Sequence, residues 1–287
     1  MSAPDQTILS VSKLSVRFAQ SQVLAVRDVS FELGAERLGI VGESGSGKST
    51  VGRAIMRLLP NSAKVEAERL DFEGAPLLGL NEGHMRKLRG HKMALIMQDP
   101  RYSLNPVLSV GKQVAEAAKL HLGLGKREAY AAAAAMLERV RIADVERTMR
   151  LYPHQISGGM GQRIMIAITL VAKPRIIIAD EPTSALDVTV RRQLLELLDE
   201  LVSARGIGLI FITHDLDLAE GFCDRLLIMY SGQILEELPA SSLGNAKHPY
   251  TRGLLASMPR LEAPEKRLSA LVRDPAWQRD VKRSIAQ

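Results

Sequence analysis

The first part of the chain alternates short apolar runs with polar residues. Within residues 8–33 this alternation recurs at 8–11, 14–16 and 29–31, which predicts antiparallel strands. Later apolar runs are short and unbroken, and they predict buried strands. These runs cover residues 38–41, 93–97, 176–179, 209–213 and 226–229.

Helical spacing dominates the middle of the chain. Residues 110–169 are rich in alanine and predict several helices. We interpret about 100–170 as a helical subdomain inserted into an α/β core. Another helix is predicted at 49–59, because Pro60 and Asn61 would end it. A later amphipathic helix carries its apolar face at Val190, Leu194, Leu197, Leu198 and Leu201.

Apolar strands separated by helices predict an α/β fold with a mostly parallel core sheet covered on both faces. The residues at 8–33 add an antiparallel β subdomain to this core. A chain of 287 residues can form one large domain with an appendage. Because the composition changes near Gly244, we expect a main domain over 1–244 and a C-terminal extension over 245–287.

Composition and charge narrow the setting. No stretch approaches the roughly 20 apolar residues of a membrane helix. Residues 1–6 do not resemble a signal peptide, so a cytosolic chain is expected. The single cysteine, Cys223, cannot form an internal disulfide. The net charge is +6, but basic and acidic residues are interspersed along the chain. We therefore interpret most charged residues as solvated surface, with contact to an anionic membrane as the second possibility.

A glycine-rich loop between a predicted strand and a predicted helix carries the strongest chemical signal. It fits G-x-x-x-x-G-K-[ST], in which backbone N–H groups and a helix N-terminus surround phosphate oxygens. Lys48 would reach the β- and γ-phosphates of a nucleoside triphosphate, and the Ser49 hydroxyl would bind Mg²⁺. The pattern predicts a P-loop NTPase whose nucleotide-binding residues are Gly42, Glu43, Ser44, Gly45, Ser46, Gly47, Lys48, Ser49 and Thr50.

Two carboxylates follow the apolar run at 176–179. Asp180 is expected to bind Mg²⁺, directly or through water, and Glu181 is expected to orient and deprotonate the attacking water. A strand that ends in Asp-Glu is usually structural when it stands alone. In a chain with a phosphate loop, the pair favours a catalytic role in nucleotide hydrolysis.

Two polar residues follow other predicted strands. His214 comes after the run at 209–213, and Gln98 comes after the run at 93–97. Parallel sheets bind ligands at these carboxyl ends. His214 would contact the γ-phosphate and hold Glu181 and the water in place, whereas Gln98 would reach Mg²⁺ or that water. A structural role is the alternative for each.

A second helix start could bind an anion at Ser157, Gly158 and Gly159. Ser157 is a typical N-cap, and the glycines leave backbone N–H groups open. Read alone, the segment is only a well-formed helix start. The phosphate loop already supplies one phosphate site, so a second one needs an explanation.

Taken together, these segments resemble ABC-type ATPases over nearly the whole chain. Their order along the chain is the phosphate loop, Gln98, the signature segment 156–160, Asp180-Glu181, 184–187 and His214. In that family two nucleotide-binding domains pack head to tail around ATP. The resemblance implies that residues 157–159 contact the γ-phosphate held by a partner and that Asp187 lies at the dimer interface.

Further segments resemble ATPases of dipeptide, oligopeptide and nickel importers. These segments are 98–100 with 103–106, 152–155, and 248–255 in the tail. The resemblance implies two integral membrane permease subunits and a second ATPase subunit, either a similar sister chain or this chain itself. It also implies an extracytoplasmic substrate-binding protein that acts indirectly, and no nucleic acid.

The same resemblance implies a peripheral subunit at the cytoplasmic face of the bacterial inner membrane. It implies import of di- or oligopeptides or a related small solute such as nickel. The cargo itself is not encoded, because the ATPase does not touch it.

Several residues depart from the pattern of this family. Ile156 replaces leucine, Met160 replaces glutamine, and Gly161 stands where arginine is common. The position that often stacks an aromatic ring on adenine is Gln20, with Phe18 two residues earlier. The cysteine cluster found in the tail of some members is not expected, because the single cysteine precedes the tail.

Two other classes of function are weaker alternatives. An ABC-type ATPase acting on DNA would insert long coiled coils, whereas roughly 60 residues without heptads separate Gln98 from Ser157. One acting on ribosomes would carry two ATPase domains. A P-loop kinase would leave the signature segment and His214 without a role, and its turnover would depend on an added small acceptor.

Overall fold

The core of the protein is a six-stranded sheet with the order β11-β10-β3-β9-β8-β7. The structure is a computed structural model that describes residues 7–19, 23–98, 103–184, 186–257, 274 and 277. Every pair of neighbouring strands in this sheet is parallel except β10 and β11, which confirms the predicted mostly parallel core. The strands are β3 (Arg37–Val41), β7 (Met93–Ile96), β8 (Ile176–Asp180), β9 (Gly208–Thr213), β10 (Arg225–Tyr230) and β11 (Gln233–Pro239).

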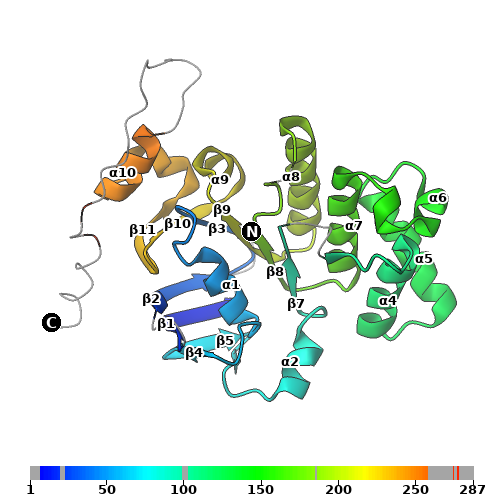
Figure 1. The fold of residues 1–287 in the computed structure, drawn as a ribbon, viewed down its shortest axis with the longest axis horizontal. Coiled ribbons are helices and arrows are strands. Elements are labelled where there is room, and N and C mark those ends of the chain that lie inside the picture. Colours follow the sequence, from blue (N-terminus) through cyan, green and yellow to red (C-terminus); the bar gives the residue numbers. More distant parts are fainter. Residues whose placement is uncertain are drawn as a thin grey trace, which may run out of the picture.

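Helices cover both faces of this sheet (Figure 1). Alternate residues of a strand point to opposite faces, and β8 shows the result. Ile177 and Ala179 belong to the apolar core under α8 and α9, whereas Ile176 and Ile178 belong to the core under α1. The sheet is therefore buried on both sides, as its unbroken apolar strands require. These helices are α1 (Lys48–Ile55), α8 (Val188–Ser203) and α9 (Leu216–Phe222).

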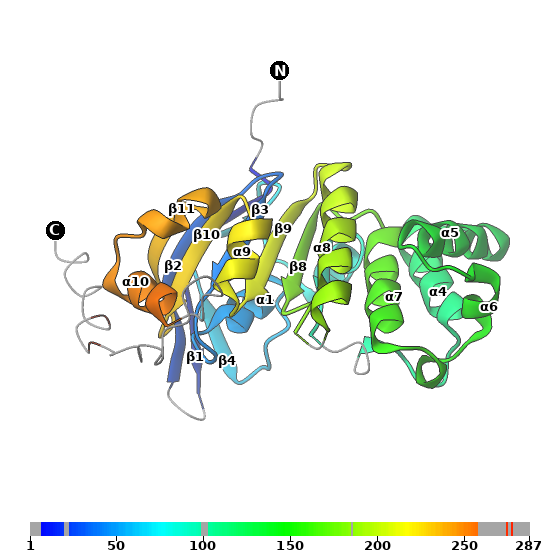
Figure 2. The ribbon, with the colours of Figure 1, turned by 90° about the horizontal axis from the view of Figure 1, so that it is seen from above.

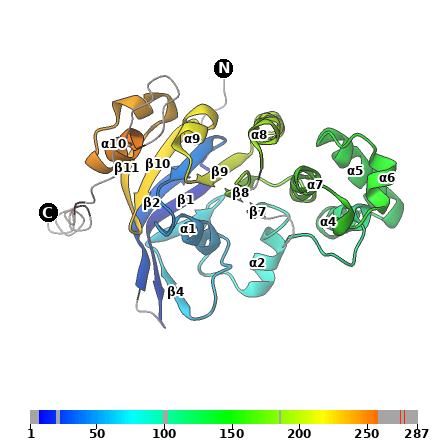
Figure 3. The same cartoon turned by 45° about the horizontal axis from the view of Figure 1, so that its top comes forward.

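A second, antiparallel sheet lies on the α1 side of the core sheet (Figure 3). Its strands β1 and β2 cover most of residues 8–33 and pair antiparallel, which confirms the predicted strands there. β4 and β5 both pair with β1, and β6 pairs with β5. The strands are β1 (Leu9–Phe18), β2 (Val23–Leu33), β4 (Ala63–Glu66), β5 (Arg69–Phe72) and β6 (Ala75–Pro76).

The helical region predicted from the alanine-rich middle of the chain is confirmed. Its helices gather at one end of the molecule, away from β10 and β11 (Figure 2). The helix α7 continues from this group toward β7 and α8. The exact limits of the subdomain stay a prediction. The elements are α4 (Val110–Leu122), α5 (Lys126–Arg139), α6 (Val145–Arg150), the 3₁₀ helix η1 (Pro153–Gln155) and α7 (Gly158–Val171).

The helix predicted at 49–59 is shorter than expected, so that prediction is wrong at its C-terminal end. α1 ends at Ile55, and Arg57 adopts a left-handed backbone with φ of 50°. The Arg57 guanidinium donates to the Leu77 carbonyl at 3.1 Å, and Arg89 Nη2 donates to the Arg57 carbonyl at 2.8 Å. The helix ends in its own last turn, because Leu58 N donates to the Arg53 carbonyl at 2.8 Å and Arg57 N donates to the Ala54 carbonyl at 2.9 Å around the left-handed Arg57. This C-cap lies before Pro60. Arg89 directly follows the short helix α2 (Glu82–Leu88).

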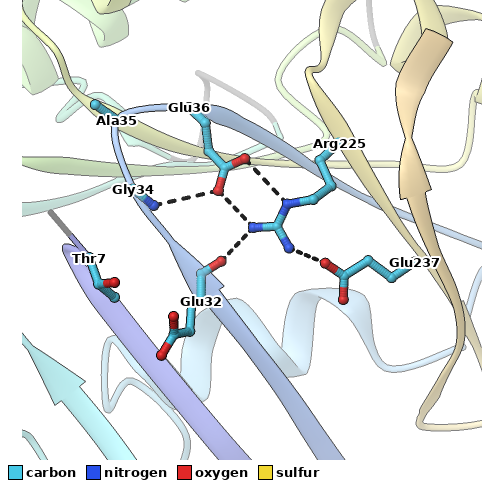
Figure 4. A pocket seen from close by; sticks show the side chains of 7 residues that line it. All are labelled: Thr7, Glu32, Gly34, Ala35, Glu36, Arg225 and Glu237. Atoms are coloured by element: carbon cyan, nitrogen blue, oxygen red, sulfur yellow. Dashed lines mark hydrogen bonds and ion pairs between the residues drawn. The ribbon is translucent and has the colours of Figure 1, made fainter. Parts of the chain in front are cut away.

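Arg225 joins the two sheets at the edge where β3 and β10 begin (Figure 4). Its Nη2 donates to the Glu32 carbonyl of β2 at 2.6 Å and to Glu36 Oε1 at 2.7 Å. Its Nη1 donates to the Glu237 carboxylate of β11. Burial acts to lower the pKa of Arg225, but the bonds from both carboxylates outweigh it and raise that pKa. This network is therefore structural, and it lies at the edge opposite the candidate site.

Two short elements that follow β11 pack back on the core. The 3₁₀ helix η2 (Ala240–Asn245) and α10 (Pro249–Ala256) lie at the opposite end of the molecule from α4–α6 (Figure 2). Residues Gln20, Asp99, Pro100 and most of the tail after Ser257 lie outside the described residues. The division of the chain at residue 244 stays a prediction.

Candidate functional site

The glycine-rich loop connects the C-terminal end of β3 to the start of α1, the context that the sequence predicts. Two glycines let the loop approach its neighbours closely. A Cβ on Gly42 would lie 2.0 Å from the Met229 carbonyl oxygen, which no side chain tolerates. Gly47, with φ of +101°, would place a Cβ 2.5 Å from the Ala25 carbonyl oxygen. The loop is therefore tightly seated between β2 and β10.

Lys48 folds back over this loop. Its Nζ donates to the Gly42 carbonyl at 2.8 Å and to the Glu43 carbonyl at 2.7 Å. The residue is only 5% exposed. Burial lowers the pKa of Lys48, and the nearby carboxylates of Glu181, Asp180 and Glu43 oppose this effect only in part. An anionic ligand in the loop would satisfy this poorly solvated ammonium group, so the loop fits a phosphate.

Ser49 and Asp180 bring together two hard oxygen groups. The Ser49 hydroxyl donates to Asp180 Oδ1 at 2.7 Å, linking α1 to the end of β8. Burial raises the pKa of Asp180, although the Ser49 bond and Arg53 act against it. Mg²⁺ prefers such oxygen ligands and usually takes its remaining ligands from water and substrate phosphates.

The three predicted catalytic residues meet at the carboxyl ends of three adjacent strands. His214 Nδ1 lies 2.9 Å from Glu181 Oε1, and Gln98 Nε2 donates to Glu181 Oε2 at 3.3 Å. The backbone of Glu181 is held by its own N–H, which donates to the Ile212 carbonyl at 2.9 Å. A cavity of about 50 Å³ beside Glu181 and His214 has room for one or a few water molecules. The arrangement can orient and deprotonate water.

Gln98 also connects this cluster to the helical region. Its backbone carbonyl accepts a hydrogen bond from Gln162 Nε2 of α7 at 3.1 Å. Gln162 is 1% exposed, so the bond is well shielded from water. Sequence reasoning missed Gln162, because a glutamine within an amphipathic helix gives no signal of its own. A movement of α7 would therefore reach the side chain that contacts Glu181.

The signature segment starts α7 as predicted, with Ser157 as its N-cap. The Ser157 hydroxyl accepts from Met160 N at 3.3 Å. Ser157 and Gly158 are exposed, and a Cβ on Gly158 would meet no atom within 4 Å. Figure 1 shows α7 and α1 well separated in the fold. Within the described residues, no hydrogen bond joins 157–159 to the phosphate loop. The chain therefore does not bring its two candidate phosphate-binding segments together.

Asp187 begins the next helix of this surface. Its carboxylate accepts from Val190 N at 2.9 Å and so caps α8. Val188, which follows it, is 79% exposed although it is apolar. The exposed apolar Val188 leaves the start of α8 available for contact with another molecule.

One contact at the phosphate loop has no counterpart in the sequence analysis. The Glu43 N–H donates to the hydroxyl of Tyr250 in α10 at 3.3 Å. The backbone N–H of Glu43, one of the predicted ATP-binding residues, is thus directed to the C-terminal part of the chain. The segment 248–255 resembles the tail of importer ATPases, but nothing in its pattern predicts this contact.

Comparisons with known proteins agree with the fold and with this site. Residues 26–184 match the family model of the ABC transporter. The chain is 42% identical to the oligopeptide transport ATP-binding protein OppD of Haemophilus influenzae, over 93% of this chain and 84% of that protein. The chain therefore belongs to the ABC transporter family. It is an ATP-binding subunit that hydrolyses ATP, and its resemblance to the oligopeptide-importer ATPases is confirmed.

Two further similarities concern a longer protein and a dimeric structure. The chain is 45% identical to the glutathione import ATP-binding protein GsiA of Escherichia coli K12 over 89% of this chain, but it spans only 43% of GsiA. A dimeric post-hydrolysis structure of the ATP-binding cassette MJ0796, bound to ADP and Pi, shares 26% identity with a TM-score of 0.69. That match covers 81% of this chain and 98% of the cassette.

None of the helices in the described part of the chain is both long and apolar enough to cross a bilayer.

Proposed function

We propose that this chain powers an ABC importer of di- or oligopeptides, or of a related small solute such as nickel. The observation that carries the proposal is the convergence of Gln98, Glu181 and His214 beside a seated phosphate loop. Its similarity to OppD over most of both chains supports the peptide class of cargo. The division into an ATPase domain over 1–244 and a C-terminal extension over 245–287 forms part of this proposal.

The described residues have distinct roles in the proposed reaction. Lys48 and the backbone of the phosphate loop bind the ATP phosphates. Ser49 and Asp180, with Gln98, would hold Mg²⁺, and the ion would neutralise charge that develops on the phosphates. Glu181 orients and deprotonates the attacking water, and His214 keeps the Glu181 carboxylate in place. Catalysis in this account is positioning and charge neutralisation, without a covalent intermediate.

The signature segment acts on a different ATP molecule from the one in the phosphate loop of the same chain. Its exposed start, far from α1, supports a head-to-tail arrangement with a second ATPase subunit, a sister chain or a second copy. ATP would then close the two subunits like a clamp. The bond from Gln162 to Gln98 gives a route from the site to α7, and from there to two integral membrane permease subunits. The subunit would lie peripherally at the cytoplasmic face of the inner membrane.

A pull-down of the tagged chain from detergent-solubilised membranes tests this function. Two integral membrane proteins are expected to co-purify with the tagged chain. A second ATPase subunit, either a sister chain or an untagged copy of this chain, is expected with them. The extracytoplasmic binding protein of the same transporter, once identified, would be tested for binding of peptides and of nickel. Recovery of the chain only from the soluble fraction, with ribosomes or DNA, would contradict the transport function and leave the ATPase chemistry in place.

A further inference from the structure

Tyr250 of α10 contacts the phosphate loop from the C-terminal part of the chain. Its hydroxyl accepts the Glu43 N–H at 3.3 Å, across 207 residues of sequence. Tyr250 is 0% exposed and is among the largest fully buried side chains of the described protein. A tyrosine hydroxyl in such surroundings is normally held in a defined hydrogen bond, because burying it unpaired is costly.

The hydrogen bond from Glu43 N–H to the Tyr250 hydroxyl adds to other contacts that hold the peptide group between Gly42 and Glu43. Lys48 Nζ holds the carbonyls of Gly42 and Glu43, while Gly42 lies against the Met229 backbone. Those contacts leave the Glu43 N–H, which Tyr250 takes up. The turn at the entrance of the phosphate loop is therefore fixed through both its carbonyl groups and its amide.

Aromatic packing fixes the ring that carries this hydroxyl. The Tyr250 ring lies 4.6 Å from that of Tyr230, at the end of β10, and 5.7 Å from that of Trp277. Trp277 also contacts Tyr230 at 5.9 Å between ring centroids, and it is 8% exposed. Aromatic pairs in such tilted and edge-on arrangements stabilise one another beyond the area that they bury. The ring therefore has little freedom to turn away from the loop.

The start of α10 is fixed to the core sheet as well. The Glu236 carboxylate of β11 accepts from Lys247 N at 2.6 Å and from His248 N at 3.2 Å. His248 Nδ1 in turn accepts from Tyr250 N at 3.1 Å and caps the helix. This chain of bonds sets the position of the Tyr250 backbone relative to the sheet that also carries the phosphate loop.

We propose that Tyr250 is a positioning residue for ATP: its hydroxyl preorganises the phosphate loop, so that the C-terminal extension sets ATP affinity. The inference rests on the proposed role of that loop. Tyr250 does not contact the reacting atoms. Without its hydroxyl the free loop samples other conformations, and ATP must order it on binding, which weakens binding. Once ATP is bound the loop is ordered in either case, so turnover at saturating ATP does not change.

The variant Tyr250→Phe in the full chain tests the proposal, because it removes the hydroxyl and keeps the ring. We expect the Kd for ATP to rise about five- to tenfold, the loss typical of one hydrogen bond. We expect kcat/KM to fall by the same factor, while kcat stays unchanged. Hydrogen exchange of the Glu43 amide, followed by NMR in the free chain, is expected to become faster.

Tyr230→Phe is the matched control, since it makes the same chemical change in the same aromatic cluster. No hydrogen bond from its hydroxyl to the phosphate loop is found in the described part of the chain, so its Kd and its Glu43 exchange should match the native chain. Trp277→Ala, which loosens the Tyr250 ring without touching the loop, should raise the Kd in the same direction by a smaller factor.

Three results would overturn the proposal. One is an unchanged Kd and unchanged Glu43 exchange in Tyr250→Phe, even with a lower Tm. Another is a loss of kcat at saturating ATP without a change in Kd. A third is an equal change in Tyr230→Phe. Lys48→Ala separates this proposal from the larger one: if it binds ATP normally, the role of the phosphate loop itself fails.

Discussion

The phosphate loop and the signature segment both precede a helix and are both predicted to bind phosphate, but only the phosphate loop is enclosed by other parts of this chain. In the phosphate loop, Lys48 and Ser46 are each 5% exposed, and the glycines touch backbone on either side. In the signature segment, Ser157 and Gly158 are exposed, and nothing lies within 4 Å of a Cβ built on Gly158. The same residue types, serine and glycine before a helix, thus serve in two different surroundings.

The difference between the two segments indicates that the signature segment needs a second ATPase subunit to form a phosphate site. A phosphate site built within one chain is closed by contacts from β2, β10 and α10, and its glycines are fixed by sterics. The signature segment has a correct cap and an open surface, but no partner groups within the described chain. This contrast supports our proposal that the two segments work on the same ATP only when two ATPase subunits meet.

Lys48→Ala should have the largest effect. Removing the buried ammonium group deprives the phosphates of their cation, so nucleotide binding should weaken and turnover should be abolished. ATP binding and phosphate release measure this effect. Lys64→Ala, at an exposed lysine of β4, is the control and should behave like the native chain. Normal hydrolysis by Lys48→Ala would show that the phosphate loop is assigned wrongly.

Glu181→Gln should separate binding from chemistry. The amide cannot deprotonate water, so turnover should fall on the order of 10²–10⁴-fold, the range typical of a positioned base. ATP affinity should be kept, because Glu181 is not part of the phosphate loop. Glu196→Gln, on the exposed face of α8, serves as the control. Steady-state rates and ATP titrations check both, and normal turnover would remove Glu181 from its proposed role.

Ser157→Arg should affect the second segment alone. The long cation would occupy the open surface that a partner's ATP must reach, so ATP-dependent dimerisation should be lost. ATP binding by the single chain should stay intact. Analytical ultracentrifugation with and without ATP measures the first effect, and Ala131→Arg on the exposed side of α5 controls for the added charge. Weakened ATP binding in the monomer would mean that Ser157 is only structural.

A pair of glycine variants sharpens the comparison of the two regions. Gly47→Ala should destabilise the fold, because a left-handed alanine costs about 1–2 kcal/mol and its Cβ would clash with the Ala25 carbonyl. Gly158→Ala should leave the Tm unchanged, since its Cβ enters open space. Thermal unfolding of both variants gives the answer. Equal losses in Tm would contradict the difference between a seated loop and an open segment.

The smallest expected effect concerns pH. Burial lowers the pKa of Lys48, so its charge should be lost below the pH at which an ordinary lysine titrates. Burial raises the pKa of Asp180, so protonation should remove this Mg²⁺ ligand above the pH of an ordinary aspartate. The plot of kcat/KM against pH reports groups of the free enzyme. Its acidic limit should therefore lie at a higher pH, and its basic limit at a lower pH, than ordinary aspartate and lysine would give. A profile as wide as the ordinary values allow would contradict this.

Sequence patterns predicted the parts of the fold in which neighbouring residues share one character, such as unbroken apolar runs. β8 and β9 are unbroken apolar runs buried on both faces, and the phosphate loop has a pattern with one physical solution. β4 was missed because its four residues alternate between half-buried and exposed and contain few apolar side chains. The end of α1 was misplaced because a left-handed Arg57 ends the helix before Pro60, and an arginine in that conformation gives no signal in the sequence.

The candidate site shows the same division. Glu181, Gln98 and His214 could be placed together, because each ends a parallel strand and such ends meet at one edge. Tyr250 could not, because its contact with Glu43 depends on how a segment 207 residues away folds back. Gln162 was missed for a similar reason, since only the packing of α7 against the strand before Gln98 gives it a partner.

Mixing two inactive variants tests the shared site most directly. One ATPase subunit of the pair carries Lys48→Ala and the other carries Ser157→Arg. If the second subunit is a sister chain, it carries the corresponding substitution in its own signature segment. In a head-to-tail pair, one site then combines two intact segments and the other combines two altered ones. The account predicts that each variant alone is inactive and that the mixture regains ATP turnover. A mixture as inactive as its components would contradict the claim that phosphate loop and signature segment meet between two chains.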